Sequence, residues 1–191
     1  PQELEEAIGA GVGRIIADSL TEIERISEIA GRLGKTQDIY MRITPGVEAD
    51  THAYICTGCE DSKFGFTLKD DFAFKCIGSA IDTANVRLVG LHCHIGSQIF
   101  ALDSFREAAG VMVGLMARVR DEYGYVLDEL DLGGGLGIAY MEGDSPSSIE
   151  DFAAMTCDAV KSSCEEFGLE LPRLIVEPGR SMVANAGVTL Y

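Results

Sequence analysis

The chain has 191 residues, 47% of them hydrophobic, which is enough for one globular domain with a sizeable core. Acidic residues number 31 against 15 basic ones, for a formal net charge of −16, so nucleic acid and anionic membranes are not expected as partners. No apolar run reaches the ~20 residues that span a bilayer, and no signal peptide is recognisable. Six cysteines without a disulfide-type spacing favour a reducing cytoplasm.

Apolar runs of strand length alternate with amphipathic runs of helical periodicity along the whole chain. The predicted strands are 11–18, 39–44, 86–93, 127–132 and 173–177. The predicted helices cover about 19–33, 69–83, 103–123 and 149–167. Near-continuous apolar strands that lead into helices are typical of a parallel sheet with covering helices, which places the chain in the α/β class.

Single residues indicate where some of these elements begin and end. Ser19 or Thr21 can cap the first helix and Gly34 ends it, while Asp103 can cap the helix that runs to about 123. Five strands are too few to close a (β/α)₈ barrel, which takes about 250 residues. An open doubly wound sheet and just over half of a barrel are therefore the alternatives.

The first polar segment after a strand reads His92-Cys-His-Ile-Gly-Ser-Gln98. Alternation along a strand places His92 and His94 on one face. Such a pair can bind a metal or can be satisfied within the core. The Gly-Ser that follows favours an anion site instead, because Ser97 can offer both a hydroxyl and a backbone N–H.

Two further segments follow the next two strands. Three consecutive glycines, Gly133 to Gly135, are not explained by packing and let backbone N–H groups approach a phosphate, although a tight connection is the alternative. Glu177 and Arg180 flank Pro178-Gly179 and can form a simple surface ion pair. A carboxylate at the carboxyl end of an apolar strand needs a hydrogen-bonding or charged partner, however, and a protonated heterocycle nitrogen is such a partner. These neighbouring strand ends predict a phosphorylated ligand.

These motifs resemble, in order and approximate spacing, the pyridoxal-phosphate (PLP) decarboxylases with an alanine-racemase-like barrel. The segments concerned are His94-Ile-Gly-Ser-Gln98, Gly133-Gly-Gly-Leu-Gly137 and Glu177-Pro-Gly-Arg180. Three others are similar to the diaminopimelate decarboxylases in that family, namely 12–19, Thr51-His52 and Ser62-Lys-Phe-Gly65. The resemblance implies a partial barrel of strands four to eight over 1–187, with 188–191 starting a C-terminal β domain.

The resemblance also implies an activity and a role for each matching residue. The activity is PLP-dependent decarboxylation of meso-diaminopimelate to L-lysine and CO₂ by a homodimer. His94 is expected to stack on the cofactor ring, and Glu177 to pair with the pyridine nitrogen; these are the two catalytic positions in the chain. The expected phosphate site consists of Ser97, Gly133, Gly134, Gly135, Pro178, Gly179 and Arg180. Arg180 is also expected to contact the distal carboxylate of the substrate, Arg42 to support the cofactor from the side, and Lys63 to lie near the subunit interface.

Two groups that the resemblance requires match no position in the chain. The lysine joined covalently to the cofactor is expected upstream, and the proton-donating cysteine in the C-terminal domain. None of the five lysines follows an apolar strand. We therefore expect an internal piece that binds PLP weakly and is inactive alone.

Other interpretations differ in the ligand they require. Cys56-Thr-Gly-Cys59 can be half a zinc site or a redox pair, but no second pair follows it, so no metal is predicted.

An ornithine, arginine or carboxynorspermidine decarboxylase is one alternative function, and a non-catalytic PLP-binding regulator is another. An unrelated phosphate-binding barrel is disfavoured because a bare phosphate needs no carboxylate such as Glu177 nearby.

Overall fold

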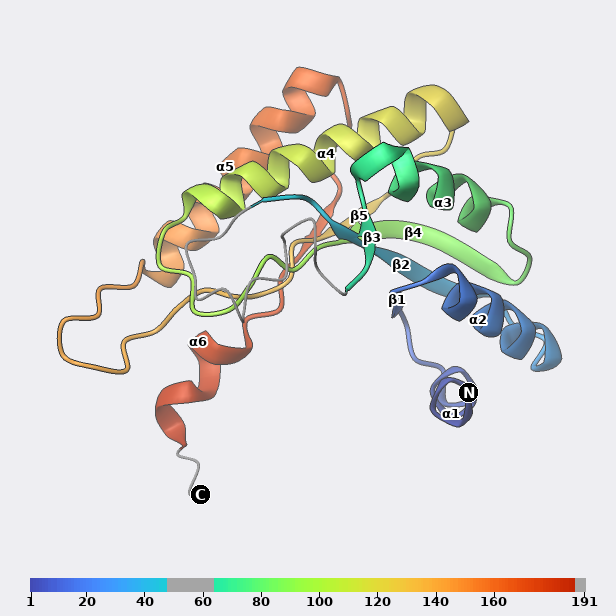
Figure 1. The fold of residues 1–191 in the computed structure, drawn as a ribbon, viewed down its shortest axis with the longest axis horizontal. Coiled ribbons are helices and arrows are strands. Elements are labelled where there is room, and N and C mark those ends of the chain that lie inside the picture. The colour runs from blue at the N-terminus through green and yellow to red at the C-terminus, as the bar shows by residue number, and fades with distance from the viewer. Residues whose placement is uncertain (48–63, 188–191) are drawn as a thin grey trace.

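The computed structural model describes residues 1–47 and 64–187 (Figure 1). The strands are β1 (Ile15–Ala17), β2 (Gln37–Thr44), β3 (Phe66–Thr67), β4 (Val86–His92), β5 (Glu129–Asp131) and β6 (Arg173–Ile175). The α-helices are α1 (Gln2–Ala10), α2 (Leu20–Arg32), α3 (Phe72–Ile81), α4 (Asp103–Tyr123), α5 (Ile149–Phe167) and α6 (Gly179–Val183). Two 3₁₀ turns, η1 (Lys69–Asp71) and η2 (Ala184–Ala186), complete the elements. Within these ranges, no helix is both long enough and apolar enough to cross a bilayer.

Several expectations concern residues outside the described ranges. These are the cysteine pair Cys56 and Cys59, the interface residue Lys63, the segment Thr51-His52 and the proposed domain start at 188–191. The four cysteines within the described ranges are free thiols.

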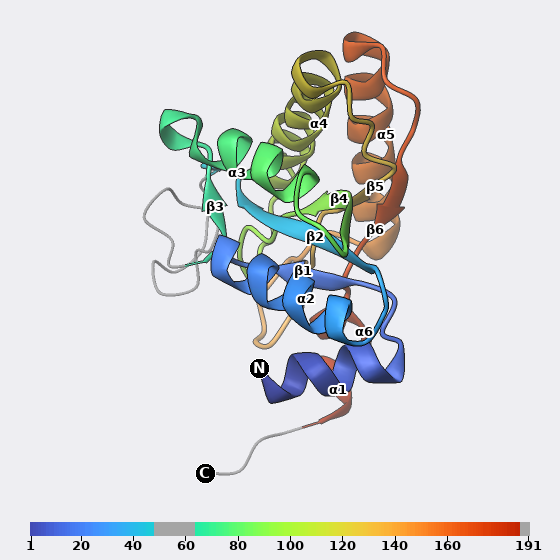
Figure 2. The same ribbon diagram turned by 90° about the vertical axis from the view of Figure 1, so that its right-hand side faces the viewer.

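The order of the strands decides between the two predicted architectures. The main sheet runs β1-β2-β4-β5-β6 with every neighbouring pair parallel, and the short β3 pairs with β2. The order in space thus follows the order in the sequence, whereas a doubly wound sheet reverses direction at a switch point. In Figure 2, α2, α3, α4 and α5 follow one another around the outer side of the sheet. The chain is therefore an open arc of barrel wall, as the half-barrel alternative predicted.

Strand β2 illustrates how the sequence separates the two faces of this wall. Ile39, Met41 and Ile43 are at most 1% exposed and belong to the core beneath the helices. The alternating residues Tyr40 and Arg42 turn to the other, concave face, because successive side chains of a strand point in opposite directions. The concave face is consequently the polar one.

The ends of several elements differ from the sequence-based expectation. Ser19 does cap α2, and its hydroxyl accepts the Glu22 N–H at 3.3 Å. The strand expected from residue 11 begins at Ile15 instead, because Gly11 ends α1 with a left-handed φ of 80°. The expected cap at Asp103 was wrong, since α4 starts without a side-chain cap. Helix ends depend on the preceding backbone, which composition alone does not reveal.

Two other elements are shorter than predicted. The helix expected over 69–83 is divided into η1 and α3, because Asp70 and Asp71 adopt φ of 53° and 60°. Strand β6 ends at Ile175, so Glu177 lies beyond the strand and not on it. By contrast, α5 begins and ends at the predicted residues.

A network of charges joins three strands at the amino-terminal end of the concave face. Arg14 donates from Nε and Nη2 to the two oxygens of Glu129 at 2.8 and 3.0 Å, and the Tyr40 hydroxyl donates to the same carboxylate at 2.5 Å. Gly90 permits β4 and β5 to approach closely here, since a Cβ there would lie 2.2 Å from the Glu129 backbone carbonyl oxygen and 3.0 Å from the Tyr40 ring. Hydrogen bonding to Arg14 lowers the pKa of Glu129 to about 2 despite its burial.

Replacing Glu129 by Gln should lower the free energy of unfolding by about 1–3 kcal/mol at pH 7, because Arg14 and Tyr40 lose their charged partner. The folded-state pKa of about 2 lies below the ordinary 4.5. The contribution of the carboxylate is therefore complete above pH 4.5 and is lost as the pH falls towards 2. Urea denaturation at several pH values measures this difference. The exposed Glu165→Gln is the matched control, and equal stabilities of both variants at pH 7 would contradict the prediction.

Candidate active site

The carboxyl ends of neighbouring strands form a row across the sheet. Arg42 of β2 is paired with His92 of β4, His92 with Asp131 of β5, and Asp131 with Ile175 of β6. Because the strands are parallel, the segments that follow them all leave at the same edge. This register brings together segments that are far apart in the sequence.

The three glycines after β5 pack directly against the backbone of the neighbouring segments. A Cβ on Gly133 would lie 2.5 Å from the Cys93 carbonyl oxygen, and one on Gly134 would lie 2.2 Å from that of Glu177. A Cβ on Gly135 would lie 2.4 Å from the Gly96 carbonyl oxygen. The statement that packing does not explain these glycines was therefore wrong. The glycines permit three strand-end segments to approach more closely than any side chain would allow.

Several amides predicted to bind phosphate already donate within the chain. The Gly133 N–H donates to Asp131 Oδ1 at 2.9 Å, and the Gly134 N–H donates to His94 Nδ1 at 3.3 Å. The Gly179 N–H donates to the Glu177 carbonyl at 2.8 Å. The glycine segment thus holds the site together before any ligand is considered.

Two hollows at this edge share His94 and Glu177. One, of about 400 Å³, is also lined by Ser97, Gly135 and Arg180, and the other, of about 530 Å³, extends towards β1 and β2. Together they form a trough that contains most of the predicted site. Pro178 lines an adjoining apolar hollow of about 230 Å³ between α5 and β6, which shares Gly134, Gly135, Gly179 and Arg180 with the trough.

Arg180 is held by two hydroxyl groups. Its Nη2 donates to Ser97 Oγ at 2.8 Å, its Nη1 donates to the Tyr140 hydroxyl, and its charge lies 5.6 Å from the centre of the Tyr140 ring. The Nε atom is buried and has no hydrogen-bond partner within the part of the chain that is described. The simple ion pair with Glu177 does not form among these residues. Tyr140 was missed in the sequence, where only its position shortly after the glycine segment marks it.

Arg42 lies on the opposite side of the trough. It forms an ion pair with Asp18 at 3.7 Å and stacks on Phe64, 4.5 Å from the ring centre. It lines the larger hollow beside His94 and Glu177. Asp18 was also missed, although an acidic residue directly after an apolar strand is the signal that singled out Glu177.

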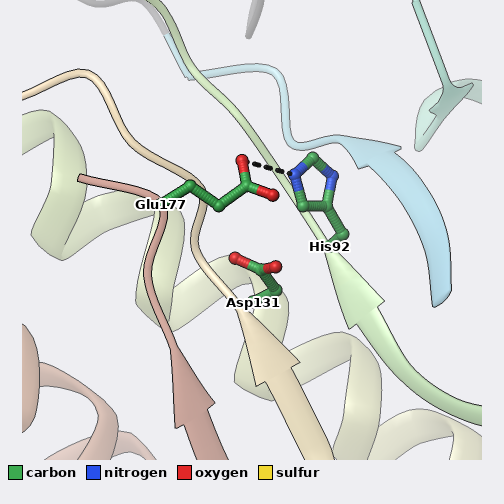
Figure 3. A group of neighbouring side chains, drawn as sticks. All are labelled: His92, Asp131 and Glu177. Atoms are coloured by element: carbon green, nitrogen blue, oxygen red, sulfur yellow. Dashed lines mark ion pairs between the residues drawn. The ribbon is translucent and has the colours of Figure 1, made fainter. Parts of the chain in front are cut away.

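The two histidines of the first motif have different surroundings. His92 is 3% exposed and lines only the larger hollow, and its Nε2 is 3.5 Å from Oε2 of Glu177 (Figure 3). His94 faces the trough, and its Nδ1 accepts the Gly134 amide. Burial lowers the pKa of both imidazoles, so both rings are neutral at pH 7. The contact between His92 and Glu177 is therefore not an ion pair.

The chemistry of these donors suits a phosphorylated heterocycle. Arg180 and Ser97 offer cationic and hydroxyl donors at one end of the trough, and the neutral His94 offers a flat ring in the middle. The Glu177 side chain is 44% exposed, and its carboxylate can accept a hydrogen bond from a protonated ring nitrogen. The buried, unpartnered Nε of Arg180 indicates that this end of the trough is built for an anion. Fold and site together define a cofactor-binding segment of a parallel β/α barrel.

Comparison with known proteins identifies the family. The family model of the pyridoxal-dependent decarboxylases, pyridoxal binding domain, matches residues 1–184. The chain belongs to this family, and its cofactor is accordingly PLP.

Curated relatives and solved structures give the same family. The chain is 45% identical over 193 aligned positions to the diaminopimelate decarboxylase of Mycobacterium bovis, covering 99% of this chain and 43% of that protein. It is 41% identical to that of Bacillus subtilis, covering 100% of this chain and 43% of the relative. The structure of diaminopimelate decarboxylase from M. jannaschii in complex with L-lysine superposes with a TM-score of 0.84 at 35% identity. The superposition covers 97% of this chain and 42% of that chain. The chain thus spans less than half the length of these relatives.

Replacing Gly134 by Ala should displace the segment that carries Glu177, because the new methyl group would lie 2.2 Å from the Glu177 carbonyl oxygen. We expect the free energy of unfolding to fall by about 2 kcal/mol or more, and the affinity for PLP to decrease. Gly13→Ala is the control, since a Cβ there meets nothing within 4 Å. Thermal unfolding and a fluorescence titration with PLP measure the two effects. Equal behaviour of the two variants would rule out the close packing of the glycine segment.

Proposed function

We propose that the protein containing this chain uses PLP to decarboxylate meso-diaminopimelate to L-lysine and CO₂. The observation that carries the proposal is the convergence of Arg180, His94 and Glu177 on one trough. The chain in which this occurs is 41–45% identical to diaminopimelate decarboxylases. When bound, PLP supplies an electron sink for the electron pair that the departing CO₂ leaves behind.

The phosphate end of the trough is proposed to be formed by Ser97, Gly135 and Arg180. The 2.8 Å hydrogen bond between Arg180 and Ser97 places both donors on the same side of the hollow. Gly133, Gly134, Pro178 and Gly179 complete the predicted phosphate site. The amides of Gly134 and Gly179 can bind the phosphate only by exchanging their present partners, whereas the Gly133 amide stays with Asp131 and Gly133 contributes the close packing of the segment.

The ring end is proposed to be formed by His94, Glu177 and Arg42. A neutral His94 can lie against the face of the ring without repelling a protonated nitrogen. Glu177 accepts the N–H of that nitrogen and keeps it protonated, as the electron sink requires. Arg42, anchored by Asp18, bounds the trough on the side of β2.

Arg180 is proposed to contact the distal carboxylate of the substrate as well. Its guanidinium has several donors in a fixed planar arrangement, of which two are engaged by Ser97 and Tyr140. The remaining donors can bind a carboxylate, for which a planar guanidinium is better suited than an ammonium group.

We also propose that the complete protein is a cytoplasmic homodimer, as the family resemblance implies. Lys63, expected near the interface, lies outside the described residues. Sedimentation of the complete protein tests the dimer, and a monomer that is fully active would refute it.

Glu177→Gln in the complete protein should lower kcat for meso-diaminopimelate about 100-fold or more, because an amide cannot keep the ring nitrogen protonated. Release of CO₂ from meso-diaminopimelate, ornithine and arginine measures both the activity and its specificity. The exposed Glu165→Gln should behave as the wild type. Faster release from ornithine or arginine would overturn the proposed substrate, and PLP binding without any CO₂ release would favour a regulator.

Arg180→Lys should raise KM for meso-diaminopimelate about tenfold or more while leaving the charge unchanged, because lysine cannot hold Ser97, Tyr140 and a carboxylate together. Steady-state kinetics measure the change. The control is Arg173→Lys, whose side chain is 77% exposed in the native protein. An unaltered KM in the Arg180 variant would exclude Arg180 from substrate binding.

A further inference from the structure

Two buried side chains, those of His92 and Asp131, lie next to the Glu177 carboxylate. His92 ends β4 and Asp131 ends β5, paired side by side across the sheet, and Glu177 reaches over them from the segment after β6 (Figure 3). One side-chain nitrogen or oxygen from each residue lies within 4.8 Å of the others. The protonation of His92 and Asp131 therefore determines the charge next to the Glu177 carboxylate.

Asp131 is the more constrained of the two carboxylates. It is 3% exposed, whereas the Glu177 side chain is 44% exposed and remains in contact with solvent. Its Oδ1 accepts the Gly133 N–H at 2.9 Å. Two ionised carboxylates at this separation, one of them buried, repel each other in a medium of low polarity.

No neighbouring cation in the described part of the chain is placed to neutralise a second negative charge. His92 is neutral, and both its buried nitrogens lack a hydrogen-bond partner among the described residues. His94 is neutral as well. Arg42, from β2, forms an ion pair with Asp18, which follows β1. Burial raises the pKa of the neighbouring Cys93 thiol, which is therefore neutral. Together with Glu177, these are the titratable and charged groups near His92 and Asp131 in the described part of the chain.

We propose that Asp131 is a positioning residue that keeps a proton at neutral pH and leaves Glu177 as the only charged carboxylate of the pair. The proton is available for a hydrogen bond towards Glu177, while the Gly133 amide keeps Asp131 in place. The cluster then carries one negative charge, which matches the one positive charge of a protonated ring nitrogen. This inference rests on the proposed function, because it assigns Glu177 to that nitrogen.

The electrostatics of the site act in the same direction as this distribution of protons. Burial raises the pKa of Asp131, the Gly133 amide opposes part of this effect, and the charge of Glu177 adds to the rise. Below this raised pKa the carboxyl group is neutral, and it ionises as the pH rises through it. Removing the proton would bring a second charge next to Glu177.

The test compares Asp131→Asn with Asp131→Ala in the complete protein, freed of PLP before the titration. Asparagine resembles a protonated aspartate, since it can accept from Gly133 with its oxygen and donate to Glu177 with its amide. At pH 7 we expect PLP affinity within about threefold of the wild type for Asp131→Asn, and a loss of about tenfold or more for Asp131→Ala. A fluorescence titration with PLP measures both.

An infrared spectrum provides a readout that a merely structural role would not change. The wild type at pH 7 should show the carbonyl band of a protonated carboxyl group, and Asp131→Asn should lack it. The absence of this band from the wild type, or a tenfold or greater loss of PLP affinity in Asp131→Asn, would overturn the inference.

Failure of the proposed function would give a different result. In that case the wild type would not bind PLP, or Glu177→Gln would decarboxylate as well as the wild type, whatever the infrared spectrum shows. The two hypotheses are therefore separated by the same set of variants.

Discussion

The contact of Gly133, Gly134 and Gly135 with the neighbouring backbone is the constraint on which the site depends. Each of these residues occupies a place where a Cβ would overlap a carbonyl oxygen. The resulting closeness allows the Glu177 N–H to donate to the Gly133 carbonyl at 2.7 Å and the Ile99 N–H to donate to that of Gly135 at 2.9 Å. The segments after β4 and β6 are thereby tied to the one after β5. This packing fixes the positions of the side chains that form the trough.

The two ends of the concave face use charge differently. Glu129 and Asp131 lie two residues apart on β5 and point to the same face. Glu129 has Arg14 and Tyr40 as close partners, so burial is outweighed and its carboxylate stabilises the fold. Asp131 has one amide donor and a carboxylate neighbour, so burial dominates and its pKa rises. One short strand thus carries a paired structural carboxylate at one position and, two residues later, a buried one beside Glu177.

Much of this arrangement could be predicted from local patterns. The periodicity of apolar residues located α5 to the residue, and the alternation of strands and helices indicated a parallel sheet. The motifs after three strands pointed to His94, Ser97, Glu177 and Arg180, which the structure places around one trough. The reason for the glycines could not be predicted, because the atoms they avoid belong to segments distant in the sequence. For the same reason Tyr140 and Asp18 were missed.

The sequence by itself determined the class of fold, the places where polar segments interrupt apolar strands, and a family resemblance that the family model confirms. These properties depend on neighbours within a few residues or on motifs with a fixed order. The tertiary structure decided between a doubly wound sheet and an arc of barrel, since only the pairing of strands distinguishes them. It also determined that the Glu129 carboxylate has close cationic and hydroxyl partners, whereas the Asp131 carboxyl group has one amide donor. Burial and pairing are properties of the assembled strands, so the different states of Glu129 and Asp131 arise only when β2, β4, β5 and β6 come together.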